Sequence, residues 1–438
     1  MKNPIAAKLG AKIRSSHASL SVIGLGYVGL PLAIEFARKG FRVQGIDRNL
    51  ARLEALRDGI SYVDGLAPAL VRSAMRSKKF DVTDRYDVMA ASDVVIICVP
   101  TPLNRVGDPD ISFIVDASEG IRKRMHPGML VVLESTTYPG TTDEVIQPIL
   151  EKSGLKVGKD FFLCFSPERI DPGNPKYHVG NIPKVVGGIT PVCADLGVAL
   201  YKKMTSSAIR VSSSRTAEMT KLLENTFRIV NIGLVNELAQ AAEGLNVDIW
   251  EAIDAAKSKP FGYMPFYPGP GIGGHCIGID PIYLSWKARL QGDHLHFIEL
   301  ARRVNAGMPH YVVSKSVLAL NTFRKKAVAK SRVLILGVSY KKNISDQRES
   351  PALDMLQEFQ KLGAQVSYHD PLVPSLQLPS GTMRSVPLTE TTLKRQDLVL
   401  VATDHDSVDY GKIVKHAPLV FDSRNRLRRF VSEKIVRL

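Results

Sequence analysis

The chain has 438 residues, of which 45% are hydrophobic and 23% charged, and it carries a net charge of +15 at pH 7. This balance is that of a globular protein with two or three domains. The four cysteines lack paired spacing, which excludes a disulfide framework and favours a reducing compartment. No apolar run approaches the length of a membrane span, and the first residues lack a secretory core, so we expect a cytoplasmic protein without a membrane partner. Its basic residues are scattered without interleaved aromatics, which argues against a nucleic-acid partner.

The first expected domain, residues 19–212, alternates short apolar runs with helical stretches. Strands are expected at residues 20–24, 41–46, 93–99, 129–134 and 161–165. This alternation predicts a doubly wound parallel α/β sheet. Residues 1–18 are expected to form a tail ahead of it.

A glycine fingerprint, GLGYVG, directly follows the first expected strand and opens a helix. Gly24, Gly26 and Gly29 allow a tight turn and a close approach of a pyrophosphate to the helix N-terminus. Asp47 ends the second strand, where a carboxylate binds ribose hydroxyls, which favours NAD. Arg48 beside it leaves NADP open, and a purely structural glycine turn is the alternative.

The second expected domain, residues 213–325, is helical. Residues 215–244 have helical apolar spacing and predict one long helix, on which Lys221 and Asn225 share a face. A lysine and an amide there could stabilise an oxyanion, although a solvated face is the usual meaning of such a pair. The run at 259–274 is dense in proline and glycine and predicts an ordered loop or lid.

Cys276, in the run GGHCIGID, is the best candidate for a reacting atom. Two glycines precede it, so a ligand can come close. A cysteine nucleophile together with a dinucleotide fingerprint indicates oxidation of an aldehyde through a thiohemiacetal and a thioester. Asp280 could act with Cys276 on a hydroxyl or a water, or it could simply cap a helix that begins near Pro281.

Two polar residues follow strand ends of the first domain. Glu168 suits a general base for thioester hydrolysis, and the alternative is an ion pair with Arg169. Thr137 could hold a water, although it could equally be a turn residue.

The third expected domain, residues 326–438, echoes the first. Residues 332–337 match the first strand and its glycine, and residues 362–370 match the second strand and its aspartate. The glycine trio is missing, and a basic insertion, SYKKNISDQRES, stands in its place. Four cations could neutralise a diphosphate, although each alone could be a solvated charge: Lys341, Lys342, Arg348 and Arg424. We therefore expect two Rossmann-like sheets with different ligands, joined by a helix.

Over about residues 20–427 the chain resembles the UDP-glucose/GDP-mannose dehydrogenase family. The resemblance rests on GLGYVGLP, CVPTPL, ESTTYPGTT, SPERI, KLLENTFRIVNIGLVNE, GPGIGGHCIGIDP and LGVSYKKNISDQRESP, in this order. It implies two Rossmann-like domains around a central helical dimerisation domain, and a homodimer or a multiple of dimers. It also implies a four-electron oxidation of the C6 alcohol of a nucleotide sugar, with two NAD per turnover.

The resemblance also implies roles for individual residues. Cys276 would be the nucleophile, Lys221 and Asn225 would hold the oxyanion, Asp280 and Thr137 would assist proton transfer, and Glu168 would serve in thioester hydrolysis. The implied NAD contacts are Gly24, Gly26, Tyr27, Val28, Gly29, Asp47, Arg48, Pro100, Thr101, Thr136 and Arg348. The implied substrate contacts are Glu168, Arg169, Lys221, Asn225, Tyr267, Gly269, Gly271, Gly273, Tyr340, Lys341 and Arg424. No metal is expected.

One departure bears on the substrate. The UDP-glucose branch has a second glutamate four residues after the one that matches Glu168, and here that place is Pro172. SPERI with KPFGYMPFYPGPGIGGHC is instead similar to the branch that acts on UDP-N-acetylhexosamines, whose products feed surface polysaccharides. This favours UDP-N-acetylglucosamine, with UDP-N-acetylgalactosamine next. UDP-glucose, GDP-mannose and a non-catalytic protein that binds nucleotide sugars or nucleic acid stay open as alternatives.

Overall fold

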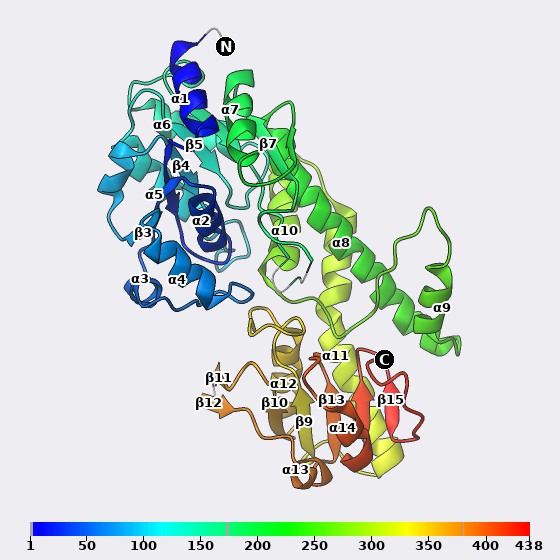
Figure 1. The fold of residues 1–438 in the computed structure, drawn as a ribbon. Coiled ribbons are helices and arrows are strands. Elements are labelled where there is room, and N and C mark those ends of the chain that lie inside the picture. Colours follow the sequence, from blue (N-terminus) through cyan, green and yellow to red (C-terminus); the bar gives the residue numbers. More distant parts are fainter. Residues whose placement is uncertain (1–2, 172–173, 175, 380) are drawn as a thin grey trace. The chain divides into compact units, whose positions relative to one another are not determined.

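The computed structural model describes residues 3–171, 174, 176–379 and 381–438, without the side chains of His275 and Cys276. Pro172 lies outside the described residues. The chain divides into two compact units (Figure 1), Met1–Glu224 with Ile282–Asp293 and Asn225–Pro281 with His294–Leu438. Within the described residues, no helix combines the length and the apolar character that crossing a bilayer requires.

The first unit contains an eight-stranded sheet in the order β3-β2-β1-β4-β5-β6-β7-β8. Its strands are β1 (Ser19–Ile23), β2 (Arg42–Ile46), β3 (Phe80–Thr83), β4 (Val94–Ile97), β5 (Leu130–Leu133), β6 (Phe162–Phe165), β7 (Lys184–Gly188) and β8 (Ala208–Arg210). The helical segments of the sheet domain are α1 (Pro4–Arg14), α2 (Gly29–Arg38), α3 (Leu50–Arg57), α4 (Pro68–Arg76), η1 (Tyr86–Ala91), α5 (Ser112–Arg122), η2 (Thr141–Ile146), α6 (Gln147–Glu151) and α7 (Pro191–Tyr201). Strands β4, β5 and β6 are buried along their whole length, because apolar side chains cover both faces of the sheet.

The expected parallel sheet is confirmed from β3 to β6, and the direction reverses beyond it. Strand β7 pairs with β6 in antiparallel fashion, and β8 is parallel to β7. Consequently β7 begins at the edge of the sheet where β6 ends. The first residue of β7, Lys184, is thereby delivered to the edge that carries the candidate site.

The turn after β1 has the predicted glycine geometry. Gly24 has φ +90°, and a Cβ on it would lie 2.4 Å from the Cys98 carbonyl oxygen. A Cβ on Gly29 would lie 1.9 Å from the Gly24 carbonyl oxygen. Side chains at these two positions would collide with backbone, so the tight turn requires glycine.

The N-terminal residues, expected as a tail, form helix α1. The Asn3 side chain caps it by accepting hydrogen bonds from the amides of Ile5 and Ala6. Leu9 and Ile13 are buried in the core of the first unit, where α1 lies along α7 (Figure 1). Apolar residues at three- and four-residue spacing fix this docking.

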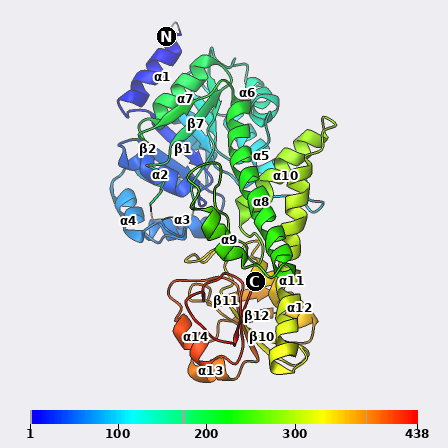
Figure 2. The ribbon, with the colours of Figure 1, turned by 90° about the vertical axis from the view of Figure 1, so that its right-hand side faces the viewer.

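The second unit contains helices and a smaller sheet. Helix α8 (Ser214–Gly244) starts in the first unit and is the predicted long helix (Figure 2). It is followed by α9 (Ile249–Ala256), α11 (His296–Arg324), α12 (Pro351–Lys361), α13 (Glu390–Lys394) and α14 (Tyr410–His416). The sheet is parallel with order β10-β9-β13-β14-β15, formed by β9 (Arg332–Leu336), β10 (Gln365–His369), β13 (Leu398–Val401), β14 (Val420–Asp422) and β15 (Ile435–Arg437), beside a hairpin of β11 (Ser375–Leu378) and β12 (Gly381–Arg384).

The second sheet repeats the first strand–turn geometry, as the sequence predicted. The Gly337 amide donates to His369 O at 2.8 Å, just as the Gly24 amide donates to Ile46 O at 2.7 Å. The aspartate that matches Asp47, Asp370, is bonded inside the protein. Its Oδ2 accepts from the amides of Val338 and Ser339 and from His405 Nε2, and its Oδ1 accepts from the amides of Leu372 and Val373.

Helix α10 (His275–Arg289) begins earlier than the sequence suggested. It runs through Pro281, so Asp280 lies inside the helix and is not its N-terminal cap. For the same reason Cys276 is the second residue of a helix rather than part of a loop. The proline-rich segment before it, residues 259–274, has no regular structure, as predicted.

Candidate active site

Strands β1, β2, β4, β5 and β6 all end at one edge of the first sheet. Because they are parallel, this edge gathers the glycine turn after β1, Asp47 after β2, Thr137 beyond β5 and Glu168 beyond β6. Ligands of doubly wound sheets bind at this edge. The candidate residues of the first unit are therefore on neighbouring strand ends, as the sequence predicted.

The glycine turn and Asp47 fit a dinucleotide. A Cβ on Gly26 would meet nothing within 4 Å, so the turn opens onto free space at the N-terminus of α2. Asp47 is oriented by hydrogen bonds from the amides of Leu25 and Asn49, both at 2.9 Å. Arg48 is exposed, and its Nη1 lies 3.4 Å from Asp116 Oδ2. Of the other expected NAD contacts in this unit, Thr101 is buried, Pro100 is exposed, and Tyr27, Val28 and Thr136 are half-buried.

A buried lysine and a buried carboxylate face each other at this edge. Lys221 Nζ lies 3.7 Å from Glu168 Oε2, and the two residues are only 5% and 7% exposed. A solvated helix face, the ordinary meaning of a lysine at this position, does not describe Lys221. Arg169, the alternative partner expected for Glu168, forms a bidentate ion pair with Glu224, with Nη2–Oε1 at 2.6 Å and Nε–Oε2 at 3.2 Å. Its Nη1 donates to the Pro183 carbonyl.

Thr137 is buried in a loop that a second carboxylate holds. Its hydroxyl lies 2.5 Å from the Thr141 hydroxyl. Glu218, fully buried, accepts from the Gly140 amide at 2.7 Å and from the Thr142 amide and hydroxyl at 2.9 and 2.6 Å. Burial raises the pKa of Glu218, and these three donors oppose that shift. Sequence reasoning missed Glu218, and its one signal was a carboxylate a helical turn before Lys221.

In the second unit, the amide of Asn225 binds the carboxylate of Asp280. Asn225 Nδ2 donates to Asp280 Oδ2 at 2.6 Å, and Asp280 is 1% exposed. The pair joins the part of α8 in this unit to the first part of α10. Cys276 lies one turn before Asp280 on that helix, and its side chain is outside the described residues. A helix N-terminus favours the thiolate form of a cysteine.

The glycine-rich loop before α10 packs against the third expected domain. A Cβ on Gly269 would lie 2.7 Å from Arg424 Nη1, and one on Gly273 would lie 2.6 Å from the Tyr340 Cβ. The Gly274 amide donates to Arg348 O at 3.1 Å. Arg424 is half-buried, and its Nε donates to the Ala402 carbonyl at 2.8 Å, which leaves its Nη nitrogens beside the loop. The structure thus brings together expected substrate residues that are far apart in the sequence.

Other expected ligand residues of this unit have internal contacts. The Tyr267 hydroxyl donates to Asp254 Oδ1 at 2.6 Å, and its ring stacks on Trp250. Arg348 pairs with Asp346, with Nη2–Oδ2 at 2.6 Å. Lys341 is half-buried, and Gly271 has φ +121°, a conformation that favours glycine. No group of three or more histidine, cysteine or acidic side chains able to hold a metal ion occurs among the described residues.

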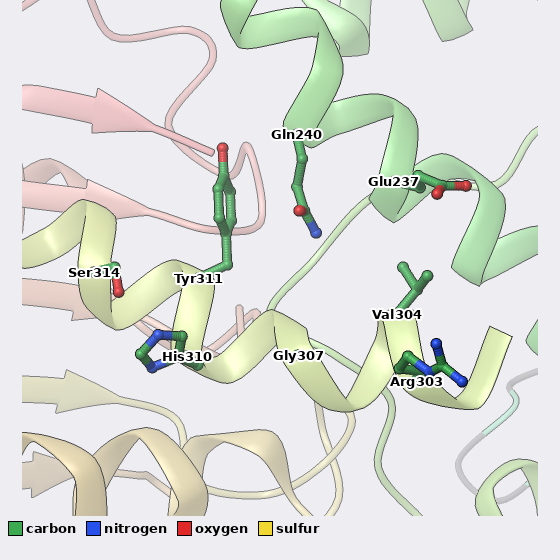
Figure 3. A pocket seen from close by; sticks show the side chains of 8 residues that line it. All are labelled: Glu237, Gln240, Arg303, Val304, Gly307, His310, Tyr311 and Ser314. Atoms are coloured by element: carbon green, nitrogen blue, oxygen red, sulfur yellow. The ribbon is translucent and has the colours of Figure 1, made fainter. Parts of the chain in front are cut away.

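A separate cavity of about 410 Å³ lies between α8 and α11 (Figure 3). It is lined by Glu237, Gln240, Arg303, Val304, Gly307, His310, Tyr311 and Ser314. None of the expected site residues lines this cavity. It is therefore not the site that the sequence predicted.

Comparisons with known proteins agree with the architecture. The UDP-glucose/GDP-mannose dehydrogenase family matches in three parts: its NAD binding domain at residues 18–205, its central domain at 215–307 and its UDP binding domain at 334–429. A UDP-N-acetyl-D-glucosamine 6-dehydrogenase of Pseudomonas aeruginosa is 42% identical over 357 residues, which cover 81% of this chain and 83% of that protein. One from Salmonella typhi is 38% identical and covers 89% of this chain and 90% of its own. The structure of a UDP-D-ManNAc dehydrogenase from Pyrococcus horikoshii aligns with a TM-score of 0.85 at 32% identity, covering 95% of this chain and 97% of that one.

We predict that Gly269→Ala weakens UDP binding about tenfold or more. The added Cβ would displace the Arg424 guanidinium, which lies 2.7 Å from its position. A displaced cation loses charge-assisted hydrogen bonds to a diphosphate, each worth about 1.5–3 kcal/mol. Isothermal titration calorimetry with UDP measures the change.

Gly307→Ala is the matched control, because a Cβ on Gly307 meets nothing within 4 Å. This variant should bind UDP as the parent does. Equal affinity of Gly269→Ala and the parent would show that the loop and Arg424 do not hold the nucleotide.

Proposed function

Since the chain belongs to the UDP-glucose/GDP-mannose dehydrogenase family and is an NAD-dependent UDP-sugar dehydrogenase, we propose that it oxidises the C6 hydroxyl of UDP-N-acetylglucosamine to the carboxylate. The observation that carries the chemistry is the buried pair of Lys221 and Glu168 at the sheet edge beside the dinucleotide turn. A cation and a carboxylate in this position supply an oxyanion partner and a base.

When bound, NAD accepts a hydride in each of two oxidations, so that one alcohol, two NAD and one water give one carboxylate, two NADH and three protons. The glycine turn and Asp47 would hold it. The chain itself supplies the nucleophile. The Cys276 thiolate adds to the C6 aldehyde to give a thiohemiacetal, which the second oxidation converts to a thioester. Water then breaks the C–S bond and releases the acid and the thiol.

The remaining residues control charge and protons. The Lys221 ammonium stabilises the oxyanion at C6, and Glu168 takes a proton from the water that attacks the thioester. Asn225 fixes the orientation of the Asp280 carboxylate through their 2.6 Å hydrogen bond. Thr137 and Asp280 would assist proton transfer through water.

Substrate binding belongs to the second unit in this proposal. The Gly269–Gly274 loop would wrap the sugar, and Arg424, with Tyr340 and Lys341, would contact the UDP. The half-buried guanidinium of Arg424, whose ε-nitrogen bonds a neutral carbonyl, suits an anionic ligand.

The relatives support an N-acetylhexosamine and leave two candidates for it. The relatives from Pseudomonas aeruginosa and Salmonella typhi are named as UDP-N-acetyl-D-glucosamine 6-dehydrogenases. A Pyrococcus horikoshii relative, 34% identical over 93% of this chain, is named UDP-N-acetyl-D-mannosamine dehydrogenase. UDP-N-acetylmannosamine, which differs at C2 of the sugar, is therefore the second candidate.

A substrate panel with NADH formation as the readout tests the proposal. We expect UDP-N-acetylglucosamine to give two NADH per sugar with the highest kcat/KM among the UDP-linked N-acetylglucosamine, N-acetylmannosamine, N-acetylgalactosamine and glucose. A higher kcat/KM with UDP-N-acetylmannosamine would change the proposed substrate to that sugar and leave the proposed reaction unchanged. Absence of NADH with every nucleotide sugar, GDP-mannose included, would refute the enzyme.

We predict that Cys276→Ser lowers steady-state NADH formation about a thousandfold or more. The alcohol of serine is a much weaker nucleophile than a thiolate, so the aldehyde is not trapped as a thiohemiacetal and no thioester can form from it. NAD binding, measured by calorimetry, should be unchanged.

Cys193→Ser is the control for a thiol-to-hydroxyl change. The Cys193 sulfur accepts hydrogen bonds from the Leu163 amide and the Thr190 hydroxyl, which a serine oxygen can also accept. Normal acid production by the Cys276→Ser variant would contradict the thioester route.

We also place the enzyme in the cytoplasm, because Cys98, Cys164 and Cys193 are free thiols suited to a reducing compartment.

The proposal includes a homodimer or a multiple of dimers, which α8 supports. Four large apolar residues of this helix are 46–58% exposed: Leu223, Phe227, Leu234 and Leu238. At 100° per residue they fall within an arc of about 60°. Two buried residues, Ile229 and Ala239, lie on the opposite side of the helix. An apolar stripe on the outer face of a helix that already has a packed face is typical of an interface.

We predict that Leu234→Glu with Leu238→Glu converts the dimer to a monomer, because two carboxylates would be buried in the interface without partners. The molar mass measured by light scattering after size-exclusion chromatography should fall from twice the mass of the chain to the mass of a single chain. Gln240→Glu adds one carboxylate about 100° away from the nearer edge of the stripe and should stay dimeric. A parent protein that runs as a monomer at micromolar concentration would rule out the interface.

A further inference from the structure

A buried ion pair at the edge of the first sheet takes no part in the mechanism above. Lys184 Nζ lies 2.9 Å from Glu134 Oε2, and the two residues are only 5% and 1% exposed. Glu134 directly follows β5, and Lys184 is the first residue of β7. The two meet because β7 runs antiparallel to β6 and so starts where the other strands end.

Tyr201 contacts both members of this ion pair. Its hydroxyl donates to Glu134 Oε1, and the Lys184 ammonium lies 4.8 Å from the centre of its ring. Burial raises the pKa of Tyr201 well above its ordinary value, and the Glu134 charge adds to that shift. Tyr201 therefore keeps its hydroxyl proton at neutral pH and donates it to Glu134. Both carboxylate oxygens of Glu134 are thus held by fixed donors.

The pair also holds the chain beside the proposed base. Lys184 Nζ donates to the Pro167 carbonyl at 3.1 Å, one residue before Glu168. The β6–β7 register pairs Cys164 with Gly188 and Phe165 with Gly187, and its continuation sets Glu168 opposite Lys184. Glu134, Glu168 and Lys184 line one small hollow. The Glu168 carboxylate is additionally held by the Ile170 amide.

Stability alone does not account for this arrangement. Taking a lysine and a glutamate out of water costs several kcal/mol per ion, and apolar residues of the same volume stabilise a core equally well or better. What the ion pair contributes is a fixed position for the main chain next to Glu168. An ammonium with fixed bonds to Glu134 and to a main-chain carbonyl sets the position of the Pro167–Glu168 peptide.

We propose that Lys184 and Glu134 are positioning residues that fix the Pro167–Glu168 peptide so that the Glu168 carboxylate is placed to deprotonate the water that hydrolyses the thioester. This inference rests on the proposed function. It assigns no contact with substrate to either residue. Loss of the pair leaves both oxidations possible and slows the release of the acid.

Stopped-flow absorbance of NADH together with intact-protein mass spectrometry tests the inference. In Lys184→Met and in the charge-neutral double variant Glu134→Gln with Lys184→Met, we expect the first-turnover burst of NADH to persist. The steady-state rate should fall about tenfold or more relative to the burst, since general-base contributions run about 10²–10⁴-fold. The acyl-enzyme should accumulate as a mass equal to the chain plus the acylating UDP-sugar. Lys184→Arg keeps the charge and should recover part of the steady-state rate.

Two controls make the outcome decisive. Glu168→Gln should show the same burst and the same acyl-enzyme, and failure of this variant to do so would remove Glu168 as the base and with it the proposed mechanism. Lys12→Met breaks an ion pair with Asp93 of 2.6 Å at the opposite edge of the same sheet. It should lower the melting temperature but leave the ratio of burst to steady state unchanged.

The inference is overturned if Glu168→Gln accumulates acyl-enzyme and the Lys184 variants do not. It is equally overturned if the Lys184 variants lower burst and steady state by the same factor, because that is the result of a merely structural role. Should Lys184→Met fail to fold, Lys184→Arg and Tyr201→Phe carry the test, with a smaller fall in the ratio expected for each.

Discussion

Strand β7 enters the first sheet against the direction of β6, whereas the strands from β3 to β6 all run the same way. A strand that is parallel to β6 would bring its last residue, not its first, to the edge with the glycine turn. The reversal therefore puts the Lys184 ammonium at the ends of β5 and β6, where it bonds Glu134 and the Pro167 carbonyl. The loop that follows β6 and carries Glu168 is thus held from the side by the first residue of β7.

On the other side of the site, too, a buried charged side chain holds a loop in place through hydrogen bonds. Thr137 lies in a loop without regular structure, and Glu218 on α8 holds that loop by accepting three hydrogen bonds. Lys221 lies one turn further along the same helix. One helix thus carries both a group that holds a loop in place and a group that faces the candidate base, so that bending of α8 would alter both.

The sequence predicted those features that depend on local geometry. Gly29 requires glycine because a Cβ there would meet the carbonyl oxygen of Gly24 in the same turn, and Gly24 requires it because its φ is +90°. Both requirements are visible in the fingerprint. The long helix was also predictable from its apolar periodicity, and the second Rossmann-like sheet from the repeated glycine–aspartate spacing. Cys276 was found from its motif, although its place in the first turn of α10 was not.

Features that depend on distant pairing could not be predicted. Lys184 and Glu134 are fifty residues apart, and nothing local indicates that β7 reverses. Burial of Lys221 depends on which face of α8 packs inward, and a single helical pattern does not say what covers it. Helix α10 was expected to begin at Pro281, since proline favours the first turn, yet the structure tolerates this proline seven residues into the helix.

The two Rossmann-like sheets end their second strands in the same way and differ in what surrounds the final carboxylate. His405 Nδ1 accepts from the Asn343 amide, so its Nε2 carries the proton that is shared with Asp370. Burial alone would raise the pKa of Asp370, but the donors, His405 first, hold it below its ordinary value. A nucleoside seeking this carboxylate would compete with the histidine and four amides that already surround it. Redesign of this sheet to accept a dinucleotide would therefore have to start by removing His405, and restoring the missing glycines would not suffice.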